Sequence, residues 1–285
     1  MGVGYQKTDR KVVDYDLWFM GGQNLAIRGP QYDFSFQGNR LACLGAAQTF
    51  GRFVKDPYPN QLGKLLGQPI INFGFSGAGP EYFLKRKALI SSVQEFETVI
   101  FQVMSARSVS AGAFECNHKN NGMLRQLDGA DNGWRLAAIA LKSFFEEFGP
   151  SAFKAQIEQQ QKAWLEGYIQ LGKFFTGRKI LLWMSEIEPR NALNLESFDM
   201  TTFPHFVTSQ MLSELQKEGF ELVQAVRASP IKQLLLNDLT GTVEAVFSKH
   251  LFPNRPYHTQ EINTYYPDQK MHDLVTGQLL NALFK

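Results

Sequence analysis

The chain has 285 residues, of which 44% are hydrophobic, enough for one large domain with a packed core. Its formal net charge is +2 and its basic residues are dispersed, so nothing in the composition favours binding to nucleic acid or to an acidic membrane. The two cysteines, Cys43 and Cys116, form no metal or redox motif, and no pair of histidines has the spacing of a metal site.

The N-terminal segment, residues 1–16, is charged and has no apolar core, so it does not have the pattern of a secretory signal. No segment of the chain is apolar over a length sufficient to span a membrane. Together these features predict a cytoplasmic protein.

Predicted strands alternate with predicted helices along the chain. The strands are expected at residues 40–44, 69–73, 98–104, 179–184 and 221–226. The helices are expected at residues 60–66, 80–91, 134–148, 152–175, 206–218 and 268–284, and the last of these is amphipathic. This order favours a parallel sheet that is covered by helices on both faces.

The predicted fold is therefore a single α/β domain over residues 1–285. It is a three-layer α/β/α sandwich with a mainly parallel five-stranded sheet, and residues 105–176 form a loop and helical insertion or lid. Ligands of such sheets bind beyond the carboxyl ends of the strands. The loops at these ends begin at the following residues: Gly45, Gly74, Ser105, Ser185 and Arg227.

The loop after the first strand is the most informative motif. Residues 45–51 read Gly-Ala-Ala-Gln-Thr-Phe-Gly, and they resemble the first block of the SGNH/GDSL hydrolases, Gly-Asp-Ser-x-Thr-x-Gly. Ala46 stands in the place of the family's Asp, and Ala47 stands in the place of its nucleophilic Ser. An alanine methyl group cannot attack a carbonyl carbon.

The later blocks of that superfamily have counterparts as well. Gly74 follows the second strand, in the place where the backbone N–H of a glycine helps to bind the oxyanion. It either has that role or is needed only for a positive φ or for tight packing. In the third block Ser105 replaces Gly and Arg107 replaces Asn. In the fifth block Asn263 replaces the triad Asp and Tyr266 replaces the triad His. The resemblance thus implies an SGNH-like, flavodoxin-like fold in which all three triad positions have changed.

A second resemblance covers nearly the whole chain. The sequence resembles a bacterial domain family of unknown function in the segments 28–30, 45–51, 72–84, 102–104 and 181–183, and at His118-Lys119. This resemblance supports the fold and the neighbourhood of the site, but it implies no substrate.

Several polar residues in the strand-end loops are candidates for binding a ligand. Arg107 either forms a salt bridge or presents a cationic fork to a carboxylate, sulfate or phosphate. Gln48 and Thr49 either cap the following turn or contact the ligand. His118 and Lys119 either lie on the surface or complete an anion site with one titratable base.

Other residues are candidates for the lost base and nucleophile. His272, in the last helix, either packs in the core or serves as the base, whereas His205 follows Pro204 and is expected to begin a helix. Ser76 lies in a near miss to the Gly-x-Ser-x-Gly nucleophile elbow, and Ser105 is the alternative position for a relocated nucleophile. The same glycine-rich stretch is only a partial dinucleotide fingerprint, so no cofactor is indicated.

Three functions follow from these patterns. The first is a group transferase of acyl or sulfo type, or a hydrolase-like enzyme, that acts on a glycan or another polar acceptor. The second is a pseudoenzyme that binds a carbohydrate or an anionic small molecule without turnover. The third is a hydrolase with Ser76 or Ser105 as its nucleophile. No feature of the sequence indicates an oligomeric state.

Overall fold

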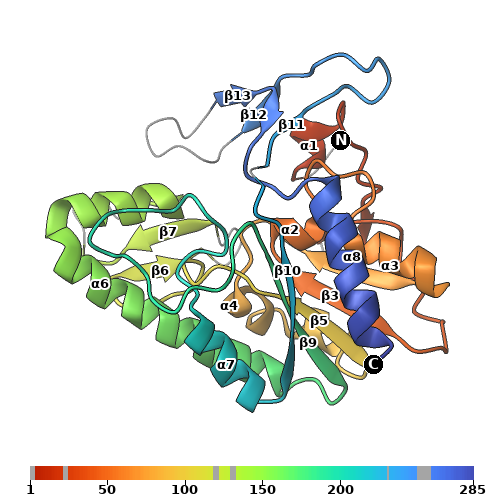
Figure 1. Cartoon of the computed structure of the whole chain (residues 1–285), viewed down its shortest axis with the longest axis horizontal. Coiled ribbons are helices and arrows are strands. Elements are labelled where there is room, and N and C mark those ends of the chain that lie inside the picture. Colours follow the sequence, from red (N-terminus) through yellow and green to blue (C-terminus); the bar gives the residue numbers. More distant parts are fainter. Residues whose placement is uncertain (1–3, 22–24, 118–121, 129–132, 230, 249–257) are drawn as a thin grey trace.

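The computed structural model describes residues 4–21, 25–117, 122–128, 133–229, 231–248 and 258–285. A five-stranded sheet lies at its centre, with all strands parallel and in the order β10-β9-β5-β3-β4 (Figure 1). The strands are β3 (Leu41–Gly45), β4 (Ile70–Gly74), β5 (Thr98–Gln102), β9 (Arg178–Ser185) and β10 (Phe220–Val226). This is the flavodoxin-like order of a doubly wound sheet, and it confirms the predicted fold class and all five predicted strands.

Both faces of the sheet are buried, because alternate side chains of each strand point to opposite sides. Leu44 of β3, Phe101 of β5 and Leu181 of β9 join one hydrophobic core. Their neighbours Cys43 and Ile100 join another core on the opposite face. Burial on both sides explains why the strands read as continuous apolar runs.

Helices cover each face of the sheet. The larger core is closed by α4 (Pro80–Leu84), α5 (Lys87–Ser91), α6 (Ala137–Gly172) and α7 (Ser209–Lys217). The smaller core is closed by α3 (Tyr58–Leu66) and α8 (Gln269–Leu283), which pack side by side (Figure 1). The helix predicted at residues 80–91 is thus two short helices, and the other helix predictions are confirmed in position.

Helix α6 is longer than expected and belongs to the core. It joins the two helices predicted at 134–148 and 152–175 across a break at Gly149, where φ is 77°, followed by Pro150. Its buried side chains belong to the larger core, so the helical part of the predicted insertion forms a layer of the sandwich rather than a lid. The preceding loop carries a small antiparallel sheet of β6 (Phe114–Cys116), β7 (Met123–Gln126) and β8 (Arg135–Leu136).

Two aromatic side chains of α6 hold the backbone where β5 ends. The indole Nε1 of Trp164 donates a hydrogen bond to the carbonyl oxygen of Met104 over 2.8 Å. The hydroxyl of Tyr168 donates to the carbonyl oxygen of Gln102 over 2.7 Å and accepts from the N–H of Met104 over 2.9 Å. Helix α6 therefore fixes the chain immediately before Ser105.

Helices α7 and α8 each begin at a residue whose side chain caps the first turn. The hydroxyl oxygen of Thr208 accepts a hydrogen bond from the N–H of Met211 in α7, and the carboxylate of Asp268 accepts one from the N–H of Met271 in α8. Arg227 pairs with the same Asp268 carboxylate, so the end of β10 is tied to the start of α8.

Short elements surround the carboxyl edge of the sheet. They are α1 (Gln6–Asp9), β1 (Trp18–Phe19), β2 (Ala26–Ile27), α2 (Ala47–Phe50), β11 (Gln233–Leu234), β12 (Val246–Ser248), β13 (His258–Gln260) and β14 (Ile262–Asn263). A third hydrophobic cluster joins the N-terminal segment to α2 and to Tyr266. None of the helices in the described ranges has the length and hydrophobicity needed to cross a bilayer.

Candidate functional site

Two glycines allow α2 to lie directly on the ends of β3 and β4. A Cβ atom at Gly45 would lie 2.1 Å from the Oγ1 of Thr49, and one at Gly74 would lie 2.1 Å from the backbone N of Phe50. The N–H of Gly74 donates to the Oδ1 of Asn72 over 3.0 Å. Of the two expected roles of Gly74, close packing and oxyanion binding, these contacts favour close packing, because its N–H has a partner inside the protein.

A pocket lies beyond the carboxyl ends of β3, β4 and β5, where the strand-end loops predicted it. We call it the central pocket, and its lining includes Tyr5, Ala46, Ala47, Gln48, Ser76, Ser105, Arg107, Ser108, Phe203, Tyr265 and Tyr266. Seven of the residues singled out from the sequence thus meet in one place: Ala46, Ala47, Gln48, Ser76, Ser105, Arg107 and Tyr266.

Two side chains of the central pocket have polar atoms without partners. Arg107 is partly buried, and its Nε is enclosed and makes no hydrogen bond in the described part of the chain. Gln48 is 2% exposed, and its Oε1 is likewise buried without a partner. Buried polar groups nearly always have hydrogen-bond partners, and leaving one unpaired costs about 1–3 kcal/mol. Two residues of the lining thus carry an unpaired polar atom, a guanidinium nitrogen and an amide oxygen.

Ser105 makes a hydrogen bond that the sequence did not predict. Its Oγ lies 2.8 Å from the Nδ1 of His205, and the Nε2 of His205 lies 3.1 Å from the carbonyl oxygen of Met200. His205 is 4% exposed, and its pKa is held well below the ordinary value by burial and by the nearby charge of Arg107. The imidazole is therefore neutral at pH 7.

The expectation that His205 begins a helix is wrong, because α7 begins at Ser209. His205 instead lies in the loop between β9 and α7, and it is brought to Ser105 from 100 positions away. No spacing motif in the sequence marks this pair, and only the topology of the sheet joins the two loops.

The positions that resemble the triad Asp and His are occupied by structural contacts. The Oδ1 of Asn263 accepts hydrogen bonds from the N–H groups of Tyr265 and Tyr266, and its Nδ2 donates to the carbonyl oxygen of Tyr266 over 2.7 Å. The hydroxyl of Tyr266 accepts from Arg52 over 3.2 Å. Asn263 therefore shapes a turn, and Tyr266 forms a wall of the central pocket.

Two other predicted site residues lie outside the lining of the central pocket. The Oγ1 of Thr49 bonds to the hydroxyl of Tyr58 over 3.0 Å. The Nδ1 of His272 accepts from the N–H of Tyr58 over 3.1 Å, and burial, with the charge of Arg28, lowers the pKa of His272 to about 3. His272 is thus a neutral core residue and its predicted role as the base is corrected, as is the ligand role of Thr49. His118 and Lys119 lie outside the described residues.

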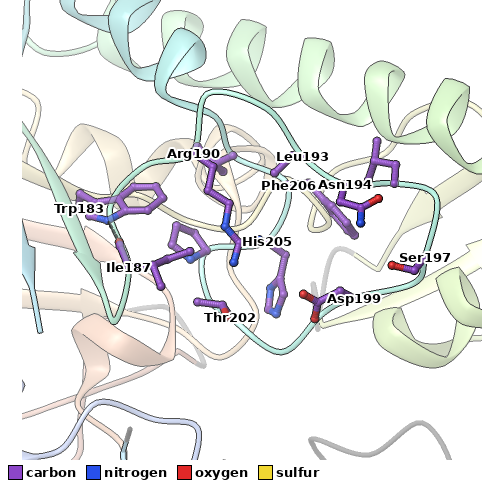
Figure 2. Close-up of a pocket in the computed structure, with 13 residues that line it drawn as sticks. Trp183, Ile187, Arg190, Leu193, Asn194, Ser197, Asp199, Thr202, His205 and Phe206 are labelled. Carbon is purple, nitrogen blue, oxygen red and sulfur yellow. Dashed lines mark hydrogen bonds between the residues drawn. The ribbon is translucent and has the colours of Figure 1, made fainter. Parts of the chain in front are cut away.

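A second pocket lies on the other side of His205. It encloses about 620 Å³, including its open mouth, and it is formed by the loop between β9 and α7. Figure 2 shows Arg190, Asp199 and Thr202 around His205 in this pocket. His205 thus lines the second pocket and not the central one, but its Nδ1 is bonded to Ser105 of the central pocket.

The described ranges contain no group of three histidine, cysteine or acidic side chains arranged to hold a metal ion. Cys43 and Cys116 are buried, and burial raises the pKa of both thiols. A buried thiol of this kind is a weak nucleophile, so both cysteines are packing residues.

The sequence matches the family described as Domain of unknown function (DUF6473) over residues 3–128 and 141–261. No curated protein matches the chain. The similar solved structures include a putative lipolytic protein of the G-D-S-L family from Desulfitobacterium hafniense, with 11% identity and a TM-score of 0.40, over 86% of this chain and 99% of that one. A catalytic mutant of an acetylxylan esterase from Geobacillus stearothermophilus has 12% identity and a TM-score of 0.42, over 86% and 93%.

Proposed function

Since this chain belongs to the family named Domain of unknown function (DUF6473), whose name states no activity, we propose a function from the geometry of the central pocket. The protein binds a small-molecule or glycan ligand through a carboxylate, sulfate or phosphate group that is held by Arg107. The observation that carries this proposal is the unpaired, buried Nε of Arg107 in the same pocket as the unpaired amide oxygen of Gln48. A guanidinium fork matches the geometry of such oxyanions.

The other polar groups of the pocket suit a ligand that also carries hydroxyl groups. The Oε1 of Gln48 is a hydrogen-bond acceptor, and a ligand hydroxyl is the complementary donor. Hydroxyl groups of Ser76, Ser105 and Tyr265 belong to residues of the same lining. An acidic sugar, or a glycan with an acidic substituent, combines both requirements.

The proposed reaction class is group transfer to or from such a polar acceptor, of acyl or sulfo type, or the corresponding hydrolysis. Ala47 provides no nucleophile where the hydrolase resemblance expects one, so a hydroxyl elsewhere must attack the transferred group. In a transferase the attacking hydroxyl belongs to the acceptor.

A second candidate function is binding of the same ligand without turnover. The observation that favours it is that the side chains of Asn263 and Tyr266 make hydrogen bonds within the protein, to the turn before α8 and to Arg52. Measured turnover of any acidic ester or sulfate at this pocket would exclude the binding-only candidate.

Binding of glucuronate and of glucose tests the proposal, since the two sugars differ in one carboxylate. We expect glucuronate to bind more tightly by calorimetric titration, and Arg107→Gln to weaken glucuronate at least about tenfold, because a hydrogen bond to a charged group is worth about 1.5–3 kcal/mol. Arg10→Gln is the matched control, since it removes the same charge from an exposed position. Equal binding of both sugars, or wild-type affinity in Arg107→Gln, would overturn the proposal.

A further inference from the structure

We infer that Ser105 and His205 form a nucleophile–base pair that acts on an ester whose acyl part carries the acidic group bound by Arg107. This inference rests on the proposed function and assigns its chemistry. The pair stands apart from the place of the lost triad serine, because Ser105 follows β5 whereas Ala47 follows β3.

The hydrogen bonds of Ser105 and His205 determine which nitrogen carries the imidazole proton and where the Ser105 hydroxyl proton points. The carbonyl oxygen of Met200 can only accept, so the Nε2 of His205 carries the imidazole proton. The Nδ1 of the neutral ring is then an acceptor, and the hydroxyl of Ser105 must donate to it over 2.8 Å. The same Ser105 oxygen accepts from the backbone N–H of His205 over 3.1 Å, which leaves one lone pair for attack.

The surroundings hold both members of the pair in place. Trp164 and Tyr168 fix the backbone just before Ser105 through Met104 and Gln102. The imidazole lies nearly parallel to the ring of Tyr265, at 17° and with 6.3 Å between ring centroids. A base that is oriented by a third group, here the carbonyl of Met200, is the general arrangement of an activated nucleophile.

The other pocket serines lack this arrangement. The hydroxyl of Ser76 accepts a hydrogen bond from Tyr5 over 2.7 Å. Among the described residues, Ser105 is the one serine of the central pocket that is hydrogen-bonded to a histidine. The geometry therefore selects Ser105 over Ser76 as the relocated nucleophile.

Arg107 gives the pair a preference for acidic substrates. Its positive charge disfavours the imidazolium that forms when His205 takes a proton. An acidic group bound to Arg107 offsets that charge and favours the protonated ring in the transition state. The same arginine thus binds the substrate and makes the base effective only when the substrate is present.

The reaction begins with attack by Ser105 on the ester. The Oγ of Ser105 bonds to the carbonyl carbon of the ester, and its proton moves to the Nδ1 of His205. The bond between that carbon and the alkoxy oxygen breaks, and the alcohol leaves with the proton from Nδ1. Water or an acceptor hydroxyl then attacks the acyl-serine and gives its proton to Nδ1, from which Ser105 recovers it.

Labelling of the unaltered protein with a fluorophosphonate tests the pair directly, because the probe phosphonylates an activated serine and releases fluoride. We expect peptide mass mapping to place the adduct on Ser105. Ser105→Ala should remove labelling and His205→Asn should slow it at least about 100-fold, the usual contribution of a general base. Ser213→Ala, an exposed serine of α7, is the control.

An adduct on another serine would overturn the inference, as would an unlabelled protein that still binds glucuronate through Arg107. In the latter case the proposed binding function stands, whereas absence of glucuronate binding would contradict the proposed function on which this inference rests.

The substrate class is tested with mono-4-nitrophenyl succinate and 4-nitrophenyl acetate. Spontaneous release, which is fast for the succinate because its carboxylate attacks its own ester, is measured without protein and subtracted. Faster protein-dependent release of 4-nitrophenol from the succinate, with the difference lost in Arg107→Gln, supports the substrate class, and equal protein-dependent rates contradict it.

Discussion

At the scale of single residues, the wall of the central pocket depends on one buried ion pair. The Nε of Arg52 lies 2.8 Å from the carboxylate of Asp9, and their side chains are 2% and 0% exposed. The guanidinium carbon also lies 4.4 Å from the ring centroid of Tyr5 and 4.9 Å from that of Tyr266. Arg52, which follows α2, thus contacts both the N-terminal segment and the turn before α8.

Asp9→Asn should therefore be strongly destabilising, by about 3–5 kcal/mol, because it leaves the charge of Arg52 buried without a counter-ion. Urea unfolding measures the difference. Lys11→Ala, which breaks the exposed pair with Glu244, should cost no more than about 1 kcal/mol. Similar losses in the two variants would show that the buried pair has no special role.

At the scale of elements, the contact of α2 with the sheet depends on the absence of a Cβ atom at Gly74. Gly74→Ala would place a Cβ atom 2.1 Å from the backbone N of Phe50, so α2 must move away from β4. We expect a loss of about 1–3 kcal/mol in unfolding free energy, as for other overpacked cores. Because Gln48 lies in α2, binding of glucuronate should weaken in the folded variant as well.

A glycine of α8 provides the matched control for that substitution. Gly277 is exposed in the interior of the helix, and nothing lies within 4 Å of a Cβ atom built there. Gly277→Ala should raise the free energy of unfolding by about 1 kcal/mol through helix propensity alone. A loss of stability in Gly277→Ala would contradict this account of the two glycines.

At the scale of the whole molecule, two buried neutral histidines make stability depend on pH. The pKa values of His205 and His272 are both lowered by burial, the latter to about 3. Below the unfolded-state pKa of about 6.5, the unfolded chain binds protons that the folded chain does not, so stability falls as the pH falls.

Urea unfolding between pH 7.5 and pH 5 should show this loss, which reaches about 1.4 kcal/mol per pH unit for each histidine below pH 6.5. The charged groups that face His205 include Arg107 on one side, and Arg190 and Asp199 in the lining of the second pocket. His272→Gln should make the slope shallower. A stability that does not change between pH 6.5 and pH 5 would contradict the neutral state of both rings.

Parallel strands explain why much of the fold and half of the site follow from sequence. Each strand is a short apolar run, and the carboxyl ends of all five meet at one edge, so Gln48, Ser105 and Arg107 had to lie close together. The partner of Ser105 was not predictable, because the loop that carries His205 has no periodic pattern. The close contact of Gly74 with Phe50 was not predicted because it depends on tertiary packing. The turn bonds of Asn263 are local, but the resemblance assigned this position to the triad Asp.

The attachment of α6 to the end of β5 gives the protein an optical reporter of its own site. Trp164 is fully buried, and its indole donates to the carbonyl oxygen of Met104, the residue before Ser105. Indole emission responds to the local electric field, so a charged guest beside Arg107 changes the colour and intensity of the light from this tryptophan. We therefore expect occupancy of the central pocket to change the intrinsic fluorescence, and loss of that change in Trp164→Phe would assign it to this one of the four tryptophans.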